Sequence, residues 1–185
     1  MTIKNKETEI FDLYDLMLEQ LRDLYDGERQ QLNYLLKADE QANSFELDEI
    51  IQMHRRETKK QLGRLEEVFN MLSEEPTGES CDGIRGIIDE ALKLSDRCMN
   101  PEVLDAALVT AIQHINHYEI AGYGTAISYA KAHDNHDIAE ILLDTLREEK
   151  RADMGLSDLA QDRINPDAKW TAIVQKSGKE STSQL

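Results

Sequence analysis

Apolar residues recur every three to four positions along most of the chain, which predicts helices and not strands. Ser44 stands where an N-cap is expected, and Pro101 falls in a first helical turn, where its missing N–H is not needed. The pattern predicts an all-α protein with four long helices and a short one. The expected helices cover residues 9–42, 44–72, 81–94, 100–132 and 137–161.

The connections predict how the long helices pair. Short links join the first to the second and the third to the fourth, so each pair should form an antiparallel hairpin. The link between the hairpins, about 73–101, holds the short helix and is long enough to cross the bundle, which would let the second and third long helices run parallel. We expect one helical bundle over residues 1–165, with Pro166 ending the last helix and a loose polar tail over 166–185.

Composition narrows the class of protein. The 185 residues are 40% apolar, and 3 Pro and 9 Gly are too few for an all-β fold. The 37 acidic residues against 21 basic ones give a net charge of −16, which disfavours nucleic-acid binding and favours cations. No apolar run approaches the ~20 residues of a membrane span, and residues 1–9 lack a signal peptide's apolar core. Two cysteines make no disulfide framework, so we expect a cytoplasmic protein with no membrane partner.

In each long helix, the face that should be apolar is interrupted by a glutamate near its middle. These residues are Glu28, Glu57, Glu119 and Glu149. Their separations of 57 − 28 = 29 and 149 − 119 = 30 place two carboxylates at about the same height in each hairpin. Burying such charges together is costly unless a cation neutralises them. Oxygen-rich ligation suits iron(II) or manganese(II) and, less specifically, magnesium and calcium.

Plainer interpretations exist for each acidic residue. In so acidic a chain, a single inward glutamate could be a boundary residue, and only the regular spacing of all four favours a site. Asp153, one turn after Glu149, is either a further ligand or an exposed acid paired with Lys150 or Arg151.

The histidines give a weaker signal. His54 and Gln61 lie one turn before and one turn after Glu57 on the same face, and each could bind a metal or hold a ligand in place. A lone inward histidine is more often a core residue, so both interpretations of His54 stay open. His117 is turned roughly 200° from Glu119 and should point elsewhere.

Some apolar residues remain after each helix has one core-facing stripe. They include Leu18 and Leu36 in the first long helix and Ile120 and Tyr123 in the third. These residues would form a second buried face if a second copy of the chain covered them. The sequence therefore predicts a homodimer and not a large cage.

Five segments resemble the YciE/YciF-like family of ferritin-like proteins. They are LRDLYDGERQQL (21–32), HRRETKKQLGRLEEVF (54–69), GESCDGIRGIIDE (78–90), NHYEIAGYGTA (116–126) and LREEKRADMGLSDLA (146–160). The likeness covers nearly everything from Phe11 to Ala160. It implies a ferritin-like four-helix bundle with a fifth short helix, a homodimer and a link to bacterial stress responses.

The ferritin-like pattern has a Glu on two helices and Glu-x-x-His on the other two. The lone glutamates match Glu28 and Glu119. Glu57 and Glu149 match the first member of each pair, but the expected histidines are absent. The resemblance also implies an acid at the position of Asn116, which places that residue beside the site.

The histidine positions are taken by Lys60 and Ala152, with Gln61 and Asp153 one residue further on. A site with fewer nitrogen ligands binds metal more weakly. The absence of these histidines favours a non-enzymatic structural protein over an enzyme.

The sequence therefore predicts a dinuclear carboxylate site for two divalent ions, iron in the first place and manganese otherwise. The expected set is Glu57 and Glu149 as bridging ligands, Glu28 and Glu119 as terminal ligands, Asp153 and His54 completing it, and Gln61 and Asn116 next to it. The expected chemistry is oxidation of iron(II) by oxygen or peroxide, of a ferroxidase or peroxidase kind, in stress protection. The alternative is a non-enzymatic, stress-induced structural or interaction protein with a weak or vestigial cation site.

Overall fold

The structure, a computed structural model, describes residues 9–77 and 80–170. Throughout these ranges the regular elements are helices and no strand occurs, so the all-α prediction is confirmed. The helices are α1 (Leu13–Gln41), α2 (Phe45–Leu72), α3 (Asp82–Ser95), α4 (Pro101–Ala132) and α5 (His136–Leu159). The predicted polar N-terminus (residues 1–8) and most of the predicted tail (171–185) lie outside the described residues.

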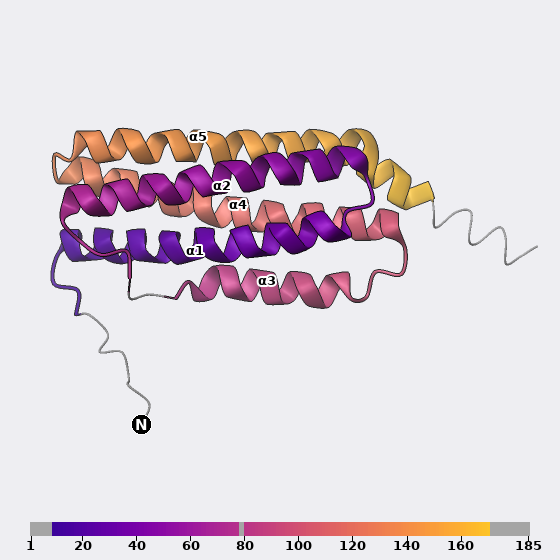
Figure 1. Ribbon diagram of the computed structural model, residues 1–185, viewed down its shortest axis with the longest axis horizontal. Helices are drawn as coiled ribbons and strands as arrows, with labels where there is room; N and C mark the ends of the chain where they lie inside the picture. The colour runs from indigo at the N-terminus through magenta and orange to yellow at the C-terminus, as the bar shows by residue number, and fades with distance from the viewer. Residues whose placement is uncertain (1–8, 78–79, 171–185) are drawn as a thin grey trace, which may run out of the picture.

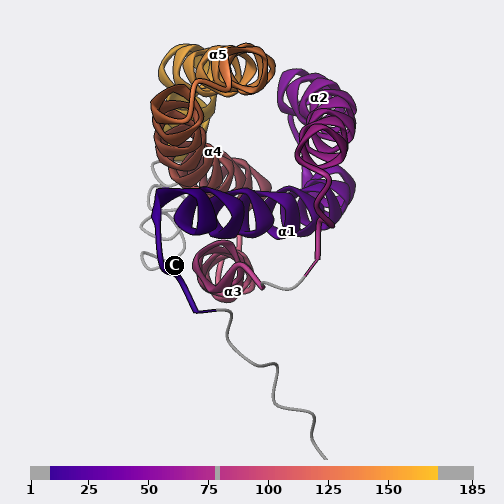
Figure 2. The ribbon, with the colours of Figure 1, turned by 90° about the vertical axis from the view of Figure 1, so that its left-hand side faces the viewer.

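Four long helices surround a common axis in the order α1, α2, α5, α4, and α3 lies outside them against α1 and α4 (Figure 2). Two antiparallel hairpins, α1–α2 and α4–α5, are joined by the segment that carries α3 along the outside of the bundle (Figure 1). This crossover makes α2 and α4 run in the same direction, as predicted. The arrangement is a ferritin-like four-helix bundle with one long crossover.

The helix starts follow from local sequence. Asp12 and Ser44 cap α1 and α2 by accepting hydrogen bonds from the backbone N–H groups of Asp15 and Leu47. Pro101 occupies the first position of α4. Both predicted signals, at Ser44 and at Pro101, are confirmed.

The end of the last helix differs from the prediction. At Ala160, α5 passes into a π-helical turn, Ala160–Ile164, and helical geometry then continues through residue 170. The N–H of Asn165 bonds to the carbonyl of Ala160, five residues back. A π turn is wider than an α turn, so it accommodates the ring of Pro166, which would clash in a regular α-helix.

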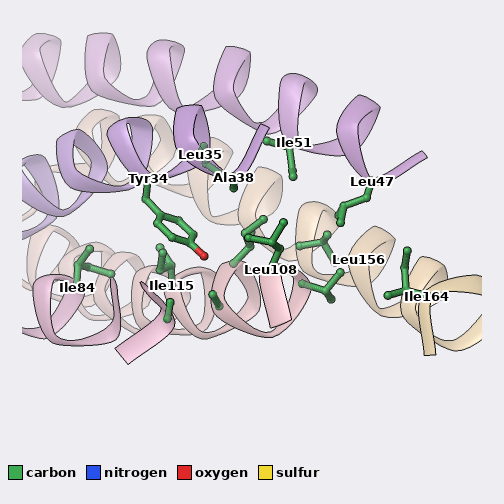
Figure 3. Close-up of a cluster of buried hydrophobic side chains, with 14 of the residues drawn as sticks. Tyr34, Leu35, Ala38, Leu47, Ile51, Ile84, Leu108, Ile115, Leu156 and Ile164 are labelled. Atoms are coloured by element: carbon green, nitrogen blue, oxygen red, sulfur yellow. The ribbon is translucent and has the colours of Figure 1, made fainter. Parts of the chain in front are cut away.

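The core consists of two apolar clusters, one at each end of the bundle. The cluster around the α1–α2 connection includes Tyr34, Leu47 and Leu108 (Figure 3). The cluster at the opposite end includes Leu21 and Phe69. Between the two clusters lies a layer of buried polar side chains, and this layer holds the candidate site.

The second apolar face predicted for a homodimer is only partly present. Leu18 and Tyr123 are buried within the chain itself, so they are not available to a partner. Leu36 is exposed and Ile120 is half-buried. Among the described residues, no helix combines the length and the hydrophobicity needed to cross a membrane.

Candidate metal centre

The polar layer is built by all four long helices. Its side chains share an exposure of at most 1%. They are Glu28 and Gln31 of α1, His54, Thr58 and Gln61 of α2, Asn116 and Glu119 of α4, and Thr145 and Glu149 of α5. Each helix places its members three, four or seven residues apart, so they share one face.

Three carboxylates meet at the centre of this layer. Glu28, Glu119 and Glu149 come from three different helices, and one ligand atom from each lies within 4.8 Å of the other two. We call these residues the carboxylate triad. All three are among the four inward glutamates that the helical spacing predicted.

One oxygen of each triad carboxylate is held by a neutral donor. The three hydrogen bonds are Tyr123 OH to Glu28 Oε1 at 2.5 Å, Gln31 Nε2 to Glu119 Oε2 at 2.7 Å, and Gln61 Nε2 to Glu149 Oε1 at 2.8 Å. Such donors fix the orientation of a carboxylate without cancelling its charge.

The second oxygen of each triad carboxylate has no hydrogen-bond partner in the part of the chain that the structure describes. These atoms are Glu28 Oε2, Glu119 Oε1 and Glu149 Oε2. Glu149 Oε2 lies 3.5 Å from Nε2 of His54, and neither ring nitrogen of His54 has a hydrogen-bond partner. Both amide atoms of Asn116 also lack partners.

Burial strongly affects the ionisation of two triad residues, Glu28 and Glu119. It raises the pKa of Glu28 well above its usual value, and the nearby charge of Glu149 raises it further. Burial likewise raises the pKa of Glu119, and the charges of Glu28 and Glu149 add to the effect. Without a cation, protons kept on Glu28 and Glu119 reduce this cost.

The donor set fits a divalent metal ion. An orphaned buried polar atom costs about 1–3 kcal/mol, and several of them gather here. Three carboxylates with a neighbouring imidazole are the ligands that iron(II) and manganese(II) accept. A cation at the centre would give partners to the free carboxylate oxygens and neutralise their repulsion.

Glu57, predicted as a bridging ligand, lies outside the triad. The inward stripe of α2 runs through His54, Thr58 and Gln61, and Glu57 is turned about 60° from His54. Glu57 is therefore half-buried at the edge of the layer. Burial and then the charge of Glu148 raise its pKa.

Asp153 also lies outside the triad, because it faces α4. Its Oδ2 is 3.3 Å from Nε2 of His117, and its Oδ1 accepts a hydrogen bond from Gln113 at 3.2 Å. His117 is 68% exposed and points away from the layer, as predicted.

Several residues that support the triad were not predicted from the sequence. Gln31 lies one turn after Glu28, and that spacing could have indicated it. The sequence predicts Tyr123 only as a core or interface residue, and in the structure its hydroxyl donates a hydrogen bond to Glu28. Arg64 and Glu148 form a two-hydrogen-bond ion pair at 2.6 and 2.8 Å beside the layer, and their sequence positions gave no signal of it.

Comparison with known proteins shows what the chain resembles. The family described as Domain of unknown function (DUF892) matches residues 12–169. Protein YciF of Escherichia coli (strain K12) is 34% identical over 155 residues, which is 83% of this chain and 93% of that protein.

Solved structures agree with this similarity. The crystal structure of the E. coli stress protein YciF has a TM-score of 0.80 at 32% identity, covering 84% of this chain and 99% of that one. YcfI from Rhodopseudomonas palustris has a TM-score of 0.79 at 40% identity, covering 82% and 96%. A protein of Xanthomonas campestris pv. campestris, with a TM-score of 0.63 at 18% identity, shares the fold alone.

Proposed function

The chain belongs to the DUF892 family, and on that premise we propose that it is a YciF-like stress protein with a metal, iron in the first place, in its carboxylate triad. The observation that carries the proposal is the convergence of three fully buried carboxylates, each with an unpartnered oxygen. We further propose that the protein oxidises iron(II) with oxygen or peroxide. It would do so in the cytoplasm, as a homodimer.

The chain's own residues would hold and orient the ion. When bound, iron(II) supplies one electron per ion to oxygen or peroxide. The triad carboxylates balance its positive charge, and the charge of three carboxylates also favours the oxidised ion. Tyr123, Gln31 and Gln61 fix their orientations, and the two apolar clusters limit access of water.

Metal analysis of protein purified without added metal or chelator tests the site. We expect bound iron or manganese in the wild-type protein and in Glu67→Gln, which removes an exposed carboxylate of α2. Glu119→Gln and Glu149→Gln should lose the metal while circular dichroism shows unchanged helix content. A triad variant that keeps full stoichiometry and affinity would refute the site.

The stoichiometry separates two versions of the site. Two ions per chain is the number predicted from the sequence, with Glu57 and Glu149 as the bridging ligands. One ion per chain would match the triad alone, whose candidate ligand atoms lie within 4.8 Å of one another.

A non-enzymatic structural protein is the second candidate. Ala152 stands where the ferritin-like pattern has a histidine, and protonation of Glu28 and Glu119 would let the bundle persist without metal. The assay that separates the candidates mixes iron-free protein with iron(II) in air or with peroxide. The proposed function requires oxidation faster than in buffer, abolished by Glu149→Gln. Protein that binds iron yet oxidises it at the buffer rate is structural.

A further inference from the structure

The carboxylate triad is sealed from solvent, since Glu28, Glu119 and Glu149 are all 0% exposed. A cation must therefore pass between two helices to reach it. Helices α2 and α5 lie side by side in the bundle (Figure 2). Between them, polar side chains continue outward from Glu149. These side chains suggest where the passage runs.

We call the boundary between α2 and α5 the seam. Gln61 connects the buried side of the seam with its solvent side. Its Nε2 donates to Glu149 Oε1 at 2.8 Å and to Glu148 Oε2 at 3.2 Å. Glu148 in turn accepts two hydrogen bonds from Arg64, at 2.6 and 2.8 Å. Side-chain exposure increases along this path, from 0% at Glu149 to 13% at Glu148 and 25% at Arg64.

A second carboxylate stands at the outer end. Glu57 lies one turn before Gln61 on α2, is half-buried, and is close enough to Glu148 for the two charges to interact. No hydrogen bond to Glu57 is formed among the described residues. Its oxygens are therefore free to receive a cation that arrives from solvent.

The amide of Gln61 provides the independent sign of a cation. Gln61 is 0% exposed, yet its Oε1 has no hydrogen-bond partner among residues 9–77 and 80–170. A buried carbonyl oxygen without a donor is uncommon, and amide oxygens are ordinary ligands of divalent cations. Rotation of the amide by about half a turn exchanges the two amide atoms and presents Oε1 to the seam.

We propose that divalent cations reach the carboxylate triad between α2 and α5, where Glu57 and Glu148 receive them and rotation of the Gln61 amide admits them. In this structure the passage is closed, because Arg64 occupies both oxygens of Glu148 and Gln61 joins Glu148 to Glu149. Opening requires Arg64 to leave Glu148. Glu57 is thus a residue of the passage and not a ligand of the bound ion. The proposal rests on the proposed metal site.

The charges at the seam should change the rates of metal loading and release more than they change the Kd of the bound metal. A negative side chain at a passage raises the local cation concentration and the rate of association. At about 0.15 M salt the screening length is about 8 Å, so charges elsewhere on the surface contribute little. Removing Glu57 and removing Arg64 should therefore change the loading rate in opposite directions.

Loading kinetics with manganese(II) test the passage. Metal-free full-length protein is mixed with manganese(II) at 0.15 M salt, excess EDTA is added after set times, and protein-bound manganese is counted by mass spectrometry. We expect Glu57→Gln to slow loading roughly fivefold and Arg64→Gln to speed it roughly threefold. Release into EDTA should change by a similar factor in each variant, so that the Kd stays within about threefold of wild type.

Matched controls remove the same kinds of charge at exposed positions elsewhere on α2 and α5, the two helices that border the passage. Glu67→Gln removes an exposed carboxylate of α2, and Arg147→Gln removes an exposed guanidinium of α5. Both should load at the wild-type rate. Circular dichroism confirms that every variant is folded.

The possible outcomes are distinct. Loss of bound manganese at equilibrium in Glu57→Gln would make Glu57 a ligand and overturn the passage. Equal rates in all variants, or equal slowing by Glu67→Gln, would also overturn it while leaving the metal site intact. Wild-type protein that never loads would overturn the proposed function, and the passage with it.

Discussion

Tyr123 shows how one hydroxyl gives a core residue a role in the candidate site. Its ring packs in an apolar cluster, and its hydroxyl donates to Glu28 at 2.5 Å. We expect Tyr123→Phe to weaken manganese(II) affinity about tenfold, because Glu28 loses the donor that orients it. Titration calorimetry measures the effect, and Tyr129→Phe on the same helix is the control. Equal affinities in both variants would contradict this role.

The two cysteines should differ in reactivity, because Cys81 is buried and Cys98 is partly exposed. Burial raises the pKa of the Cys81 thiol to about 11, so at pH 8 it remains protonated and unreactive. We expect iodoacetamide to label Cys98 and not Cys81 in the native protein at pH 8, and both after denaturation. Mass spectrometry of the peptides reports the result. Rapid native labelling of Cys81 would show that the α3 contact opens readily.

At the scale of elements, α3 is held against the bundle by a close approach at Gly83. A Cβ atom there would overlap the ring of Tyr118, whose hydroxyl is hydrogen-bonded to Asp23 at 2.9 Å and cannot easily move. We expect Gly83→Ala to lower the free energy of unfolding by about 1–3 kcal/mol. Gly86→Ala on the same helix meets no atom within 4 Å and should be neutral or stabilising. Denaturant unfolding compares them, and equal stabilities would refute the close packing of α3.

At the scale of the whole molecule, the buried triad makes stability depend on pH. The pKa values of Glu28 and Glu119 are raised in the folded state. Their contribution to stability is fully present below the unfolded value of about 4.3 and is lost as pH rises through the folded pKa. We expect metal-free Glu119→Gln to melt above wild type at pH 8 and close to it at pH 4. Added manganese(II) should reverse the order at pH 8, and an unchanged order would contradict metal binding by the triad.

The sequence by itself determined the helices and their connections. Periodicity and caps such as Ser44 and Pro101 are local properties, and the length of the crossover sets which helices can run parallel. The π turn before Pro166 was not predictable, because a proline can either end a helix or be accommodated in a wider turn, and here the turn also contacts α4. The lengths of the connections thus predicted how the helices pair. The π turn could be seen only in the folded structure.

The candidate site was predictable only in part. Three inward glutamates, Glu28, Glu119 and Glu149, could be read from helical spacing. Glu57 and Asp153 could not be placed, because a turn of 40–60° around a helix decides whether a side chain faces the axis or a neighbouring helix, and that direction is set by packing. The sequence therefore determined which helices carry carboxylates near one level. Only the tertiary structure decided which carboxylates meet, because their ligand atoms come together from helices far apart in the chain.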